Sequence, residues 1–246
     1  MSLREYYDDT YRAESGRPPG EMLEEVTKGS RGLFKFAVES KDRFLPGYDW
    51  QGLKVLEVGS GRGGAGLLLA GLGADVTLLD FSSAALAQAQ SIYQFEGQRL
   101  STVHGDVTHP DLFLPEKYDL ILDSHLLHCL TENPDRASYY RLICDHLTGQ
   151  GIFVAETMVH RKKLQIPDGF MFDERNVLWQ MIGKWTPVRR ILDSLELERE
   201  LSEAQFNIAY FYYYAQLGFV PHKSFLDLPE DILPAAVRFV LQNKLL

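Results

Sequence analysis

The sequence predicts a doubly wound α/β fold, in which helices cover both faces of a seven-stranded, mostly parallel sheet. Three observations predict it. Apolar runs alternate with helical stretches between residues 53 and 158, a glycine-rich turn follows the first run, and two further runs close the chain with no long helix between them. Strands that alternate with helices at this spacing are usually parallel and joined by right-handed crossovers. A length of 246 residues suits one such domain with additions.

Seven apolar runs predict the strands of this sheet. They are residues 53–58, 75–80, 100–104, 118–123, 151–158, 206–214 and 236–241. The first and fourth are interrupted by few polar residues, as is typical of strands buried on both faces, whereas the third is a weaker pattern. Ser82 is placed to cap a helix over the alanine-rich stretch 84–90, and Asn133-Pro134 is placed to open a helix that ends near Gly149. The last two runs predict an antiparallel hairpin.

The remaining segments carry weaker patterns. Residues 1–50 are helix-compatible and predict an N-terminal cap over a core at 51–158, followed by a lid or insert at 159–205 and the hairpin region at 206–246. Within the insert, Thr186-Pro187 predicts the start of a helix with an apolar face that reaches Leu201. The aromatic run 206–214 favours a strand, but a capping box at 202–205 would instead open a helix.

Composition and charge exclude several classes of protein. Hydrophobic residues make up 45% and charged residues 24%, which is typical of a globular domain. The net charge of −9 argues against nucleic acid as a partner, and the basic run Arg161-Lys162-Lys163 is ordinary for a solvated loop. Cys129 and Cys144 have no metal-ligand spacing. Without a signal peptide or an apolar run long enough to span a membrane, we expect a cytoplasmic monomer or homodimer.

The glycine-rich turn at residues 59–64 fits two patterns. Glycines permit positive φ and let a ligand approach the backbone, and the amides of the next helix face the same place. The turn matches the dinucleotide pattern GxGxxG, with Asp80 about 20 residues further on. It also matches acidic-x-Gly-x-Gly-x-Gly, beginning at Glu57.

On the second pattern the chain resembles the class I S-adenosylmethionine-dependent methyltransferases, a family with a Rossmann-like fold. The resemblance covers roughly residues 50–160 and continues in order through Asp80, Asp106 and Asp123. It implies S-adenosyl-L-methionine as methyl donor and S-adenosyl-L-homocysteine as product. This donor has no pyrophosphate but carries an ammonium and a sulfonium, which favour carboxylates at strand ends. Glu57, expected deep in a strand end, must be paired, either with the ammonium or with a Lys or Arg.

The resemblance implies a set of cofactor-binding residues at the ends of the first four strands: Glu57, Gly59, Ser60, Gly61, Gly63, Asp80, Phe81, Asp106, Val107, Asp123 and Ser124. Asp80 would accept both ribose hydroxyls, and Phe81 would pack on adenine. Asp106 would accept from the adenine amino group beside the Val107 amide. The alternatives are that Asp80 only caps a helix and that Asp106 is an ordinary turn residue.

Two histidines after the fourth strand, His125 and His128, are the candidates for a catalytic general base. The alternative for His128 is a place in the core. For substrate binding the candidates are Tyr11, Met158 and His160, although for any single one of them core packing is the favoured alternative. No metal cluster is indicated.

Together these patterns predict methyl transfer to a small-molecule acceptor by in-line displacement. Three alternatives stay open: an NAD(P)-dependent oxidoreductase, a non-catalytic S-adenosylmethionine-binding module, and an RNA or protein methyltransferase.

Overall fold

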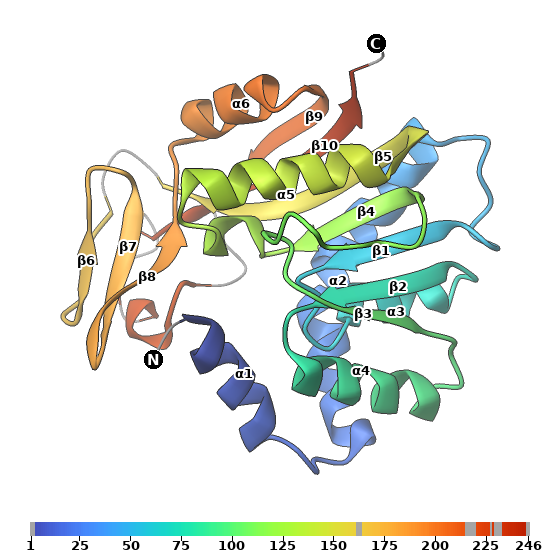
Figure 1. The fold of residues 1–246 in the computed structure, drawn as a ribbon, viewed down its shortest axis with the longest axis horizontal. Coiled ribbons are helices and arrows are strands. Elements are labelled where there is room, and N and C mark those ends of the chain that lie inside the picture. Colours follow the sequence, from blue (N-terminus) through green and yellow to red (C-terminus); the bar gives the residue numbers. More distant parts are fainter. Residues whose placement is uncertain (1–2, 161–163, 215–219, 227, 229–232, 245–246) are drawn as a thin grey trace.

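A computed structural model describes residues 3–160, 164–214, 220–226, 228 and 233–244. Seven strands form one sheet in the order β3-β2-β1-β4-β5-β10-β9 (Figure 1). Their bounds are β1 Lys54–Val58, β2 Asp75–Asp80, β3 Ser101–His104, β4 Tyr118–Ser124, β5 Leu147–Val159, β9 Phe206–Tyr214 and β10 Ala235–Asn243. Strands β1 to β5 pair in parallel, whereas β10 lies antiparallel to both β5 and β9. The predicted fold class is therefore confirmed.

Helices cover both faces of this sheet. On one face α2 (Pro19–Phe44), α3 (Gly64–Ala70) and α4 (Ser83–Phe95) bury their apolar side chains against the strands. On the other face α5 (Asn133–His146) and α6 (Ser194–Glu203) do so. Figure 1 shows α5 in front of the sheet and α2 behind it. Because the central strands are covered on both sides, they read in the sequence as almost uninterrupted apolar runs.

The aromatic run at 206–214 is the strand β9. Its register pairs Tyr213 with Val237 and Phe211 with Phe239, and the two phenylalanine rings stack with centroids 6.4 Å apart. Cross-strand aromatic contacts of this kind stabilise a sheet, so the strand is favoured over the helix that a capping box at 202–205 would have opened.

The insert after β5 differs from its prediction. Three strands, β6 (Phe170–Phe172), β7 (Val177–Ile182) and β8 (Lys184–Arg190), form a small antiparallel sheet beside the main one. The helix expected from Thr186-Pro187 is wrong, because these residues lie in β8. The true helix, α6, begins about two turns later, behind Asp193, where Asp193 and Glu196 form a capping box. Aromatic and β-branched residues in 185–188 favour a strand, and the apolar period that suggested a helix starts only with α6.

The N-terminal helix α1 (Leu3–Ala13) lies across the end of the sheet near β8 (Figure 1). It contacts α4 and β8, while the short 3₁₀ helix η1 (Leu127–Cys129) follows β4 and also contacts β8. A second 3₁₀ helix, η2 (Lys223–Phe225), precedes β10. No helix in the described part of the chain has both the length and the apolar character needed to cross a membrane.

Candidate functional site: a pocket at the carboxyl ends of the strands

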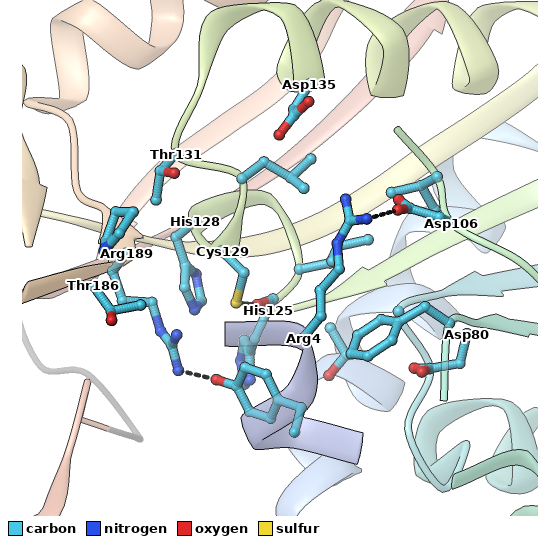
Figure 2. Close-up of a pocket in the computed structure, with 18 of the residues that line it drawn as sticks. Arg4, Asp80, Asp106, His125, His128, Cys129, Thr131, Asp135, Thr186 and Arg189 are labelled. Atoms are coloured by element: carbon cyan, nitrogen blue, oxygen red, sulfur yellow. Dashed lines mark hydrogen bonds and ion pairs between the residues drawn. The ribbon is translucent and has the colours of Figure 1, made fainter. Parts of the chain in front are cut away.

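A pocket of about 820 Å³ opens at the carboxyl ends of the parallel strands (Figure 2). In a doubly wound sheet this is where ligands bind, at the point where the strand order reverses, here between β1 and β4. We call the strand-end residues the floor: Gly59, Asp80, Phe81, Asp106, Val107, Ser124 and His125. We call the residues of α1 and β8 the roof: Arg4, Tyr7, Tyr11, Lys184, Trp185, Thr186, Pro187 and Arg189. His128, Cys129 and Met158 also line the pocket.

The glycine turn brings backbone close to the roof. Gly61 has φ +52°, and a Cβ built on it would lie 2.5 Å from the Tyr11 hydroxyl oxygen. A side chain at this position would therefore be strained and would also collide with the roof. Beside it the Ser60 hydroxyl is buried and has no hydrogen-bond partner within the described residues. The turn thus packs closely under the roof and carries one buried, unsatisfied polar atom. Gly59 lines the pocket, whereas Ser60 and Gly61 are not among the described residues that line it.

Glu57 lies behind this turn and does not belong to the described pocket lining. Its Oε2 accepts a hydrogen bond from the Gly66 backbone amide at 2.7 Å, in the first turn of α3. Burial raises the pKa of this carboxyl to about 7, against the lowering effect of that hydrogen bond. The partner is thus a helix N-terminus, which favours a negative charge, whereas the sequence suggested an ammonium or a basic side chain.

Asp80 ends β2 inside the pocket. Its Oδ2 accepts from the Gly61 amide and its Oδ1 from the Ser82 amide, both at 2.8 Å. Burial raises its pKa, although these two hydrogen bonds oppose the rise. The carboxylate therefore connects the glycine turn to the start of α4 and keeps further acceptor capacity toward the pocket. Next to it, Phe81 lines the pocket and accepts at its carbonyl from His104 Nε2 at 2.8 Å.

Asp106 lies at the far end of the floor, in a turn after β3. Its Oδ1 accepts from the Thr108 amide at 2.9 Å and from the Thr108 hydroxyl at 2.8 Å. These contacts are those of an aspartate in a turn, which was the alternative for Asp106 in the sequence. Its Oδ2 forms an ion pair with Arg4 of α1. Val107 is buried and lines the same wall. Asp106 is therefore both a turn residue and a contact between floor and roof.

Asp123, at the end of β4, is fully buried and lies behind the pocket. It accepts from the amides of Leu126 and Leu127 at 2.6 and 2.9 Å and from the Tyr139 hydroxyl at 2.6 Å. Burial raises its pKa to about 6, and the Tyr139 bond opposes this. Its carboxylate shapes the turn that follows β4, whereas its neighbour Ser124 lines the pocket.

His125 follows in that turn with φ +78°, a backbone conformation that is uncommon outside glycine. Its Nε2 lies 2.8 Å from Glu156 Oε1, and the other oxygen of Glu156 accepts from Arg238 Nε. Burial acts to raise the pKa of Glu156, but hydrogen bonds and charge from His125 and Arg238 outweigh it, so the pKa is lowered. The ionised Glu156 therefore orients the imidazole, and a neutral ring that donates from Nε2 accepts at Nδ1.

His128, in η1, is buried and differs from His125. Its Nδ1 accepts from the Met158 amide at 3.3 Å and lies 3.2 Å from the Thr157 hydroxyl. Burial, with a contribution from the charge of Arg189, puts its pKa well below the ordinary value. This histidine is therefore neutral at physiological pH, with its Nδ1 already used as an acceptor.

The three candidate substrate residues lie in different places. Tyr11 is part of the roof, and Met158 lines the pocket from β5. His160 is not among the described residues that line it, and its ring packs against Phe172 of the small sheet. The pocket also contains Cys129 and Arg189, to which no pattern in the sequence pointed.

Part of the chain is similar to known methyltransferases. Residues 55–151 match the family model of a methyltransferase domain. Over 104 residues the chain is 36% identical to an uncharacterized methyltransferase, YbaJ, of Bacillus subtilis (strain 168), which covers 42% of this chain and 40% of that protein. The chain thus spans about two fifths of the length of this curated relative.

Solved structures share the fold at low identity. An S-adenosylmethionine-dependent methyltransferase from Clostridium acetobutylicum superposes with a TM-score of 0.57 at 13% identity, over 85% of this chain and 98% of that one. DhpI in complex with S-adenosylhomocysteine superposes with a TM-score of 0.59 at 16% identity, over 98% and 97% of the two chains. Residues 55–151 are thus similar to a methyltransferase domain, and the seven-stranded sheet shares its fold with these solved structures.

Proposed function

We propose that this protein transfers a methyl group from S-adenosyl-L-methionine to a small-molecule acceptor in the cytosol, by in-line displacement. The observation that carries this proposal is one continuous pocket of about 820 Å³, with strand-end carboxylates on its floor and a roof of aromatic and basic side chains. Pockets of this volume suit small ligands.

The residues of the floor suit this cofactor. Asp80 has acceptor capacity for vicinal ribose hydroxyls, Phe81 an apolar face for adenine, and Asp106 an acceptor for its amino group. The backbone at Gly61 and the unsatisfied Ser60 hydroxyl would lie beside the methionyl part. When bound, S-adenosylmethionine would supply a methyl group that its sulfonium already activates.

The roof would hold the acceptor and exclude water. Methyl transfer from a sulfonium asks mainly for alignment and desolvation. Tyr7 and Tyr11 of α1, with Trp185 of β8, give the pocket large apolar surfaces opposite the strand ends. Ion-pair and hydrogen-bond contacts connect α1 to the floor, for example between Asp8 and the Ser82 hydroxyl at 2.7 Å.

His125 is the better candidate for a general base. It lines the pocket, and Glu156 orients its ring so that Nδ1 accepts a proton from a hydroxyl or amine of the acceptor. His128 is buried, and its Nδ1 already accepts from the Met158 amide. We therefore assign His128 a structural role.

Calorimetry with S-adenosylhomocysteine and with NAD⁺, followed by a methyl-transfer assay on a panel of phenols, amines and carboxylic acids, tests the proposal. We expect micromolar binding of S-adenosylhomocysteine, none of NAD⁺, and transfer to at least one member of the panel. Binding of NAD⁺ alone would identify an oxidoreductase. Tight S-adenosylhomocysteine binding without transfer to any acceptor would support a binding module, and methylation of RNA or protein would reject the small-molecule assignment.

A further inference from the structure

One cationic side chain in the roof differs from the other well-buried arginines of the described chain. Arg62, Arg136 and Arg238 each form an ion pair with a glutamate. Arg189 has no such carboxylate in the described residues. Its Nη2 donates to the Tyr7 hydroxyl and its Nη1 to the Val188 carbonyl at 2.6 Å, while its Nε is buried without a partner.

The groups close to Arg189 do not neutralise its charge. The acidic groups that act on it within the described part of the chain are the Cys129 thiol and the phenols of Tyr7 and Tyr6. Burial raises the pKa of the Cys129 thiol, and it raises that of Tyr7 to about 12, so both are neutral at physiological pH. A guanidinium surrounded in this way costs free energy unless an anion pairs with it.

Arg189 also lies on a definite side of the pocket. Figure 2 shows Arg189, Thr186 and Thr131 on the side away from Asp80 and Asp106, with His125 between them. At the cofactor end the pocket therefore has carboxylates, one of which pairs with Arg4, whereas at the other end it has the guanidinium of Arg189, which pairs with no carboxylate among the described residues. Lys184 adds a second cation to the same wall.

We propose that the methyl acceptor carries an anionic group, a carboxylate or another oxyanion, which Arg189 binds. The proposal rests on the function proposed above and specifies its substrate class. The guanidinium would donate hydrogen bonds to the oxyanion. The Tyr7 hydroxyl, which accepts a hydrogen bond from Arg189, would donate a second one to the same oxyanion. Held at this end, the acceptor would present its reacting atom toward His125.

Matched pairs of ligands that differ only in charge test this proposal. Benzoate and benzamide, with phenylphosphonate as a second anion, are titrated into the protein by calorimetry with and without saturating S-adenosylhomocysteine. Since hydrogen bonds to a charged group contribute about 1.5–3 kcal/mol, we expect benzoate to bind at least about 10-fold more tightly than benzamide. Preference for phenylphosphonate over benzoate would identify a phosphoryl-type oxyanion, and the reverse a carboxylate.

Arg189→Gln is expected to remove the preference for benzoate, and Arg189→Lys to keep part of it. Both variants should bind S-adenosylhomocysteine within about 3-fold of the wild-type protein, because the anion belongs to the acceptor. Arg190→Gln is the matched control. This neighbouring arginine donates to Asn133 Oδ1 outside the pocket, so its replacement should leave the preference intact.

Three results would overturn the inference: equal binding of benzoate and benzamide to the wild-type protein, a preference that persists in Arg189→Gln, or a loss of S-adenosylhomocysteine binding as large as the loss of benzoate binding. The last result would mean that Arg189 binds the carboxylate of the cofactor. The first comparison needs no variant, so it holds even if Arg189→Gln does not fold. Failure of the wild-type protein to bind S-adenosylhomocysteine would instead reject the proposed function, and titrations without it would still test Arg189.

Discussion

The floor and the roof of the pocket are built in different ways. Each floor residue ends a strand of one parallel sheet or follows it directly, so neighbouring strands bring Gly59, Asp80 and Asp106 to one edge. The roof joins α1 to β8, and its hydrogen bond between Tyr7 and Arg189 links residues 182 positions apart in the sequence. A sheet register therefore positions the floor, whereas a few polar side chains connect the roof.

This difference has an energetic consequence. Asp80 accepts two backbone amide hydrogen bonds within a buried network, so changing it disturbs several elements together. Arg4 and Asp106, by contrast, form an ion pair between partly exposed side chains, and such pairs contribute about 0–1 kcal/mol. We therefore expect large effects from floor substitutions and small ones from the contacts that attach the roof, and the following changes test this ranking.

The largest effect is expected in the floor, at His125. If its Nδ1 takes the proton of the acceptor, His125→Gln should lower kcat by about 10²–10⁴-fold. Binding of S-adenosylhomocysteine should change little, because the imidazole acts on the acceptor. Steady-state kinetics would measure kcat, and calorimetry would measure the binding of S-adenosylhomocysteine.

Two other histidines serve as controls for this result. His146 lies at the other end of the sheet, where its ring contacts the Glu116 carbonyl. His146→Gln should therefore leave kcat unchanged. His128→Gln should lower kcat less than 10-fold if its role is structural. A loss at His128 as large as that at His125 would reverse the assignment of the base.

Asp80→Ala is expected to weaken S-adenosylhomocysteine binding by about 3 kcal/mol, or about 100-fold. This follows from losing hydrogen bonds to a charged acceptor, each of which contributes about 1.5–3 kcal/mol. Asp75→Ala, at the exposed beginning of the same strand, is the matched control. Equal affinity of both variants by calorimetry would remove Asp80 from the cofactor site.

The sequence predicted the floor because its features are local. The glycine turn, the carboxylates and the apolar strands each lie within a few residues, and a parallel sheet then aligns them by register. The sequence did not predict the partner of Glu57, which is the amide of Gly66 at the N-terminus of α3. A backbone amide can come from almost any residue, so no residue type in the sequence indicates it.

The roof could not be predicted in the same way. The strands β6 to β8 lack a clear apolar alternation, and the helix expected at 186–187 reflects an apolar period that belongs to α6. Arg189 stands among ordinary charged residues in the sequence. Its distinguishing feature, that no carboxylate of the described residues pairs with it, is visible only in three dimensions. Long-range contacts of this kind have no periodic signature.

Glu57, which lies behind the glycine turn, allows the effect of its burial to be tested through pH. A pKa raised from 4.5 to about 7 means that the folded protein binds a proton more tightly than the unfolded chain. That contribution to stability is fully present below about pH 4.5 and is lost as the pH rises through 7. Between pH 5 and pH 8 the wild-type protein should therefore lose about 2.5 kcal/mol of unfolding free energy relative to Glu57→Gln. Urea denaturation of both proteins at both pH values measures the difference, and a constant difference would contradict it.

The smallest effect is expected for Tyr7→Phe in the roof. The substitution removes the acceptor of the Arg189 hydrogen bond but keeps the ring, over which the guanidinium lies at 5.7 Å from the centroid. We expect a loss of about 1 kcal/mol in the free energy of unfolding, because water in the pocket can replace the hydroxyl. Tyr6→Phe, on a side chain that is 40% exposed, is the control. A loss above about 3 kcal/mol would show that the roof is as firmly integrated as the floor, and the contrast between a register-built floor and a loosely connected roof would then fail.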